Sequence, residues 1–271
     1  MFGRFFRKKK NTTPSNERNL FDELFPLTGE NKKLIESKTD TIQKQMSGEE
    51  GFFKLRNYSR AYEFVETKLN QLYFDSLGWE HVESSETSTE FENSYGDFLT
   101  LNIVEPNGEM VRGESQIEVY RNWLRDLFVK QEGGLISCEE FESSNGLIAY
   151  ESITKCRREG ATGIDYVYLM NISSFEEQKL YQLMIKVFEM EPTGMRDNIF
   201  IHPLCDVLGI GMEKIHENYR QDPYDKDFKA GNTMNLSERE EFDYLFPFHA
   251  LSIIRREIQP RIRKSLRFEE K

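Results

Sequence analysis

The clearest hydrophobic pattern in the sequence lies in residues 54–74. Apolar side chains recur there at alternating spacings of three and four residues, which places them on one face of an α-helix. They are Leu55, Tyr58, Tyr62, Val65, Leu69 and Leu72. The pattern predicts an amphipathic helix that ends before Gly78, preceded in residues 1–50 by a basic tail and one or two short helices.

A strand-rich block follows the predicted helix. Strands are predicted over residues 79–82, 87–92 and 98–104, the last of which alternates so that one face is apolar, and the glycine-containing segment 93–97 favours a hairpin. An amphipathic helix is predicted over 115–131, and Gly133 and Gly134 after it are expected to terminate it. Four more strands are predicted over residues 135–142, 147–155, 164–172 and 180–190, the last from its aromatic and β-branched content.

The remainder of the chain is predicted to be helical and irregular. A helix follows Gly194 and is interrupted or restarted near Pro203, and residues 216–236 form a loop. Ser237 and Glu240 have the spacing of a capping box, which predicts a helix that stops at Pro247.

The last predicted helix carries an apolar stripe made of Leu251, Ile254, Ile258, Ile262 and Leu266. Pro260 lies within it and implies a kink or a restart. The stripe is interpreted in two ways. It packs on the rest of the protein, where the neighbouring arginines form ion pairs, or it lies on a membrane surface, and the first interpretation is favoured.

This order of elements resembles the Mog1/PsbP-like fold, in which helices flank an antiparallel sheet. The similarity lies in the placement of Gly78-Trp79, of the hairpin in residues 91–104 and of the helix over 115–131, and it covers about residues 72–210. The resemblance implies an α+β core with helical extensions at both ends, and members that are mostly partner-binding, chaperone-like or assembly proteins without catalytic activity. No site residue is transferred from it. The expected divisions are residues 1–50, 51–215 and 216–271.

Composition places the chain among soluble globular proteins. It has 271 residues, and its 21 Phe and 12 Tyr supply the burial that a disordered chain lacks. Its formal net charge is −11, although residues 1–10 carry five basic and no acidic side chains and residues 250–271 also carry a basic excess. The acidic body between these ends argues against nucleic-acid binding and favours a basic protein partner.

Cysteine content and the N-terminus indicate a cytoplasmic protein. Cys138, Cys156 and Cys205 are few and odd in number, and the predicted hairpin places the first two out of register for a disulfide, so we expect reduced thiols. The basic residues at the N-terminus are followed by polar ones and not by the apolar run of a signal peptide.

The basic N-terminus has a second interpretation besides a solvated tail. Aromatic and basic side chains are interleaved there in a pattern that suits an anionic membrane surface. These residues are Phe2, Arg4, Phe5, Phe6 and Arg7.

No catalytic residue, cofactor or metal site is assigned from the sequence. The four histidines are scattered, and neither the His202/Cys205 pair nor Cys156 next to two arginines forms a recognisable metal site or nucleophile. The carboxylates of Asp222, Asp225 and Asp227 could hold a hard cation, but the Asp-Pro sequence equally makes an ordinary turn.

The sequence therefore predicts a cytoplasmic, non-catalytic protein-binding module of the chaperone, adaptor or immunity type, as a monomer or homodimer. Its predicted binding surface is the sheet face or the 54–74 helix, on which Leu55, Tyr58, Tyr62, Val65 and Leu69 form the contact stripe. The alternatives are a hydrolase that uses Asp222 and Asp225, and a peripheral membrane protein held by its N-terminus.

Overall fold

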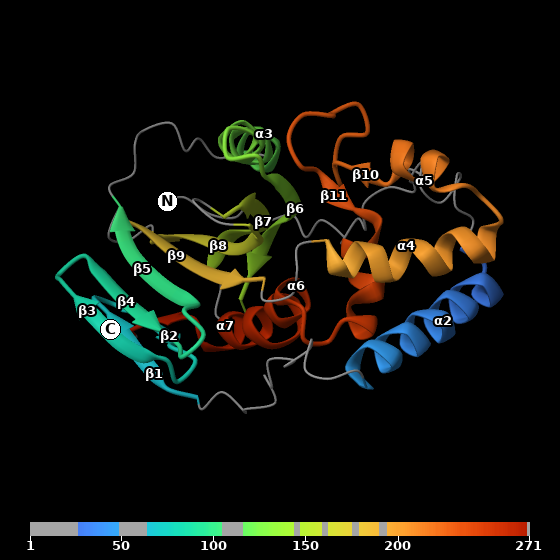
Figure 1. Cartoon of the computed structure of the whole chain (residues 1–271). Coiled ribbons are helices and arrows are strands. Elements are labelled where there is room, and N and C mark those ends of the chain that lie inside the picture. Colours follow the sequence, from blue (N-terminus) through green and yellow to red (C-terminus); the bar gives the residue numbers. More distant parts are fainter. Residues whose placement is uncertain are drawn as a thin grey trace.

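The computed structural model describes residues 27–48, 64–104, 116–143, 147–158, 162–174, 179–189 and 194–269. Its centre is a seven-stranded sheet in the order β3-β4-β5-β9-β8-β7-β6, and every neighbouring pair is antiparallel (Figure 1). The strands are β3 (Glu80–Ser84), β4 (Ser88–Glu92), β5 (Phe98–Val104), β6 (Gly134–Glu142), β7 (Ile148–Arg157), β8 (Ile164–Ser174) and β9 (Lys179–Phe188).

All seven strands match predicted ones, including β9, which was predicted from the aromatic and β-branched content of residues 180–190. In β9, buried and half-buried residues alternate from Leu183 to Phe188, so one of its faces points to the core and the other points outward. The β6–β7 register places Cys138 opposite Ser152, so Cys138 and Cys156 are out of register, as predicted. All three cysteines are free thiols.

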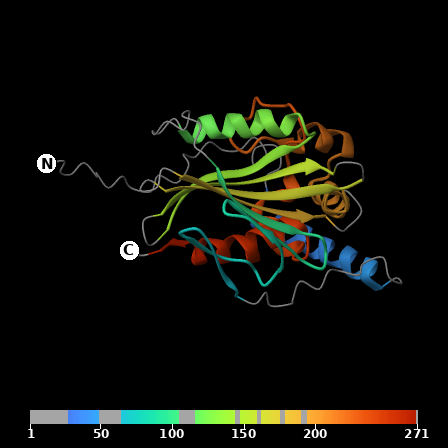
Figure 2. The same cartoon turned by 90° about the vertical axis from the view of Figure 1, so that its left-hand side faces the viewer.

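Helices cover both faces of this sheet (Figure 2). On one face, α3 (Gln116–Val129) lies over β6 and β7, where Tyr120, Leu124 and Phe128 are buried. On the other face lies the C-terminal helical segment, formed by α6 (Ala250–Ile253), the π-helical turn η3 (Ile254–Ile258) and α7 (Gln259–Ser265). The structure confirms the α+β class with an antiparallel sheet between helices.

The five residues of the predicted C-terminal stripe are all buried in the main core, which also contains the sheet residues Tyr168 and Ile185. The arginines next to the stripe form ion pairs with the acidic body, as expected: Arg261 with Asp75, and Arg263 with Glu151. The helical path continues through Pro260, because the wider π-helical turn directly before it accommodates a residue without a backbone N–H.

The predicted helix over 54–74 is wrong where the structure describes it. Residues 66–75 form a hairpin of β1 (Glu66–Leu69) and β2 (Leu72–Asp75), and β12 (Arg267–Phe268) completes a three-stranded sheet. Asn70 has a φ of 55°, in the left-handed region that asparagine tolerates and that a two-residue hairpin turn requires. Residues 54–63 lie outside the described part of the chain.

A second hydrophobic core joins the N-terminal helix to the segment after the sheet. It contains Ile35, Phe200, Leu204 and Phe242, which are all fully buried. The helices are α2 (Gly29–Gly48), α4 (Met195–Leu208) and α5 (Met212–Asn218), followed by β10 (Arg220–Gln221), β11 (Met234–Asn235), η1 (Leu236–Glu238) and η2 (Glu240–Leu245). The expected divisions at residues 50 and 215 stay a prediction.

Two local predictions in this region need correction. α4 runs without interruption through Pro203. The helical segment after β11 begins two residues earlier than predicted, because Asn235 is its cap and donates its backbone N–H to the carboxylate of Glu238 at 2.6 Å. The segment forms two 3₁₀ helices, not one α-helix. Ser237, the expected cap, instead donates its hydroxyl to Asp197.

Candidate functional site

The predicted contact stripe is not brought together in the described part of the chain. Leu69 is buried in the main core, whereas Val65 is 42% exposed just before β1. Leu55, Tyr58 and Tyr62 lie outside the described residues. The stripe as a helical face therefore cannot include Leu69.

The predicted membrane-contact residues lie outside the described residues as well. These are Phe2, Arg4, Phe5, Phe6 and Arg7. No helix among the described residues is both long and apolar enough to cross a membrane. Contact of the N-terminus with a membrane surface stays a prediction.

Asp222 holds a loop against α3. Its carboxylate is buried and accepts two hydrogen bonds from Arg125, at 2.6 and 2.9 Å. It also accepts the backbone N–H groups of Tyr224 and Asp225, which is the pattern of an aspartate turn. Asp225 in turn accepts the N–H of Asp227, and the described residues contain no group of three or more potential metal ligands.

The cysteines are poorly suited to nucleophilic chemistry. Burial raises the pKa of Cys138 to about 12, despite the neighbouring Arg121, and burial raises the pKa of Cys156 as well. Cys205 lies on α4, where its thiol is 3.2 Å from the sulfur of Met212. Burial raises the pKa of Cys205 as well, so the reactive thiolate form is disfavoured at all three cysteines.

The hairpin of β3 and β4 forms an acidic outer edge of the main sheet. β3 is the edge strand, and all five of its residues are exposed. The register places Glu80 opposite Glu92 and Glu83 opposite Glu90, so two pairs of like charges face each other across the strands. We call these four residues the acidic hairpin, and none of them forms an ion pair with a described residue.

The sheet face next to the acidic hairpin is only partly covered by described residues. α3 contacts β6 and β7, whereas the outward side chains of β5 and β9 are half-buried. Phe98 of β5 lies opposite Lys186 of β9, whose ammonium group is 5.8 Å from the Phe98 ring and forms an ion pair with Asp165. The acidic hairpin thus continues into a surface with aromatic and polar character.

Like-charge pairs in facing positions cost stability, so replacing Glu90 by glutamine should raise the free energy of unfolding by about 0.2–1 kcal/mol, measured by urea denaturation. The gain should shrink as salt concentration rises, because exposed charges are screened. Glu140→Gln on β6 is the matched control, since Glu140 is exposed but faces Tyr150. A loss of stability in Glu90→Gln would contradict this account of the hairpin.

A network of buried charges connects the sheet to the segment after β11. Lys155 of β7 and Glu238 of η1 form an ion pair at 2.7 Å, and both side chains are almost completely buried. Tyr166 lies opposite Lys155 on β8 and donates its hydroxyl to Glu238 at 2.7 Å. Burial alone would raise the pKa of Glu238, but the charge and hydrogen bond of Lys155 outweigh it and lower that pKa.

The network continues to α4 and to the start of the C-terminal helical segment. Arg196 donates to Asp243 at 3.0 Å and to the Nδ1 atom of His249 at 3.1 Å. Asp197 accepts hydrogen bonds from Tyr219 and Asn235, and its pKa is raised chiefly by burial and then by the charge of Glu238. The two hydrophobic cores are therefore joined by a buried network of ion pairs and hydrogen bonds, in which the Nε2 atom of His249 has no hydrogen-bond partner among the described residues.

No protein-family model matches the chain, and no curated protein matches it in sequence. Among solved structures, it is similar to the Saccharomyces cerevisiae Ran-binding protein Mog1p, at 10% identity and a TM-score of 0.37, over 56% of this chain and 94% of that one. A mutant of protein Mog1 gives 10% identity and a TM-score of 0.38 over the same shares. A Bacteroides thetaiotaomicron structure gives 11% identity and a TM-score of 0.31, over 52% of this chain and 46% of that one. The Mog1 structures thus stand among those that this chain is similar to in fold, as the order of elements predicted, and no residue role is taken from them.

Proposed function

We propose that this protein is a non-catalytic binding module that takes a basic protein partner at the acidic hairpin. The observation that carries the proposal is the register of β3 and β4, which sets Glu80 against Glu92 and Glu83 against Glu90 on an exposed edge. Four carboxylates without ion pairs to described residues repel one another in the free protein. A segment rich in lysine or arginine would relieve this repulsion and be steered to the site by the charge.

Protection of the sheet edge is the alternative explanation for charged residues on β3. Edge strands commonly carry charges that prevent pairing with another chain. That explanation needs charges on the edge strand alone, whereas Glu90 and Glu92 belong to β4, which is paired on both sides by β3 and β5. The facing pairs therefore favour binding over edge protection.

The three free thiols support a reducing, cytoplasmic location for this binding. The net charge of −11 supports a partner of opposite charge.

The proposal is tested by affinity purification of the tagged full chain from its native host, followed by mass spectrometry. We compare the wild type with Glu83→Gln/Glu90→Gln and with the control Glu140→Gln/Glu142→Gln, which removes two exposed charges from the opposite sheet edge. The expected result is a partner of net positive charge that is depleted with the hairpin variant and retained with the control. With the purified partner, the association rate should fall as salt concentration rises.

Recovery of the same partner in equal amounts with the hairpin variant would contradict binding at the acidic hairpin. Failure to recover any stoichiometric partner with the wild type would contradict the binding function itself.

A further inference from the structure

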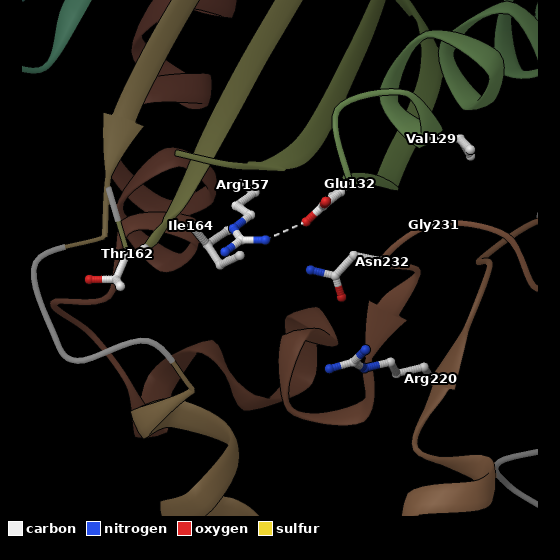
Figure 3. Close-up of a pocket in the computed structure, with 9 residues that line it drawn as sticks. Val129, Glu132, Arg157, Thr162, Ile164, Arg220, Gly231 and Asn232 are labelled. Carbon is white, nitrogen blue, oxygen red and sulfur yellow. Dashed lines mark hydrogen bonds and ion pairs between the residues drawn. The ribbon is translucent and has the colours of Figure 1, made fainter. Parts of the chain in front are cut away.

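A pocket of about 560 Å³ opens between the C-terminal end of α3, the facing ends of β7 and β8, and the β10–β11 segment (Figure 3). Arg157 and Arg220 lie on opposite sides of it, and the side chain of Asn232 lies between them. Its volume is in the range of pockets that bind small molecules. The pocket is remote from the acidic hairpin along the sheet, since β3 and the β6–β7 pair are at opposite ends of the strand order.

The charge of this pocket is opposite to that of the protein as a whole. Arg220 is exposed and forms no ion pair with any residue that the structure describes. Arg157 pairs with Glu132 at 2.7 Å, but both side chains are more than 60% exposed, so this pair contributes little and its guanidinium can turn to a ligand. Arginine forks match the geometry of phosphate and carboxylate oxygens.

The wall that carries Asn232 is fixed by direct contact between backbone segments. Gly231 has a φ of 73°, and the N–H of Asn232 donates to the carbonyl of Gly133 at 2.8 Å. A Cβ atom on Gly134 would lie 2.1 Å from the carbonyl oxygen of Asn232, so only glycine allows this approach. The backbone at Asn232 is therefore held in place before any ligand arrives, which lowers the entropy cost of positioning its side-chain amide.

The pocket adjoins a smaller buried cavity of about 90 Å³, because Ile164, Arg220 and Asn232 line both. His249 lines this inner cavity and is only 4% exposed. Its Nδ1 atom accepts from Arg196 and from the backbone N–H of Leu251, and both of these groups can only donate. The proton of the neutral ring is therefore on Nε2.

This Nε2–H group has no hydrogen-bond partner among the described residues, and an oxygen of Glu189 is 3.5 Å from it. Asp197 also lines the inner cavity. The inner cavity therefore suits neutral groups that both donate and accept hydrogen bonds, such as hydroxyls, whereas an anionic group suits the outer pocket with its two arginines.

We propose that the pocket between Arg157 and Arg220 binds a small phosphate monoester. Two guanidinium groups face the charge of about −1.5 to −2 that such a phosphate carries at pH 7, and with Glu132 on the same lining the pocket keeps one net positive charge. The phosphate group lies between the two arginines, beside the side-chain amide of Asn232. The hydroxyl-bearing part of the ligand points to the inner cavity. This site is independent of the acidic hairpin, so either proposal can fail without the other.

The test is isothermal titration calorimetry of the full chain with inorganic phosphate and, separately, with glycerol phosphate. We expect saturable binding of both, weakened at least about tenfold in Arg220→Gln and in Arg157→Gln, as loss of a charge-assisted hydrogen bond requires. Arg256→Gln is the matched control, since Arg256 is an exposed arginine that lies outside the pocket. Its affinity should equal that of the wild type.

The proposal is overturned if neither compound binds saturably to the wild type, or if Arg220→Gln binds both as tightly as the wild type. It is equally overturned if Arg256→Gln loses as much affinity as the pocket variants, because the effect would then come from net charge alone. Both pocket arginines are exposed, so the variants are expected to fold, and circular dichroism of each variant checks this.

Discussion

Replacing Lys155 by methionine should lower the free energy of unfolding by about 3–5 kcal/mol. The substitution removes the ammonium group that lies 2.7 Å from Glu238, whose carboxylate is 2% exposed. Tyr166 and the backbone N–H of Asn235 still donate to that carboxylate, but neither carries a positive charge. An unpaired buried charge then remains between the sheet and η1, and urea denaturation measures its cost.

Two comparisons show whether burial of the charge causes the loss. Lys155→Met/Glu238→Gln should recover most of the stability, because the neutral amide leaves no unpaired charge and still accepts from Tyr166. Lys44→Met removes a lysine from an exposed pair with Asp40 on α2 and should cost less than about 1 kcal/mol. A loss below about 1 kcal/mol in Lys155→Met would show that the buried pair is not needed for stability.

The main sheet could be predicted because its strands are bounded by strong local signals. The glycine-containing turn after Glu92 and the long apolar run of β8 locate the strands without knowledge of their partners. The C-terminal stripe was equally clear, since its five apolar residues have helical spacing and all pack into the core. Where the local pattern and the tertiary contacts agree, the sequence is sufficient.

The hairpin of β1 and β2 shows why the same method failed there. Leu69 and Leu72 have helical spacing, but they are also the facing residues of a tight turn. The decisive signal for a turn is Asn70, because asparagine tolerates a positive φ. A prediction that counts only the spacing of apolar residues does not register this signal. Pairing with β12, nearly 200 residues away in the chain, then stabilises the strands.

The candidate sites were only partly accessible from the sequence. The glutamates of the acidic hairpin were visible, and a turn near residues 85–87 would have placed them opposite one another, yet the register was needed to show the facing pairs. The partners in the buried network are much further apart. Lys155 and Glu238 are separated by 83 residues, and Arg196 and His249 by 53. A lysine in the interior of a predicted strand was the available signal for that network.

The stability of the protein should fall by up to about 2 kcal/mol between pH 7 and pH 5 because of His249 alone. Burial holds the pKa of this histidine well below 6.5, and the positive charges of Arg196, Lys155 and Arg255 lower it further. In the unfolded chain the ring has its ordinary pKa of about 6.5. As pH falls below that value, the unfolded state binds a proton that the folded state does not, so stability is lost in this direction.

At pH values well above about 6.5 the ring is neutral in both states and contributes no pH dependence. The measurement is urea denaturation at half-unit steps from pH 7.5 to pH 5. In His249→Gln this part of the pH dependence should disappear, whatever the effect of the substitution on stability at pH 7. His202→Gln is the matched control, because His202 is exposed on α4, and it should keep the wild-type slope. A wild-type slope that survives in His249→Gln would assign the pH dependence to other groups and remove the evidence that the ring is kept neutral between Arg196 and Glu189.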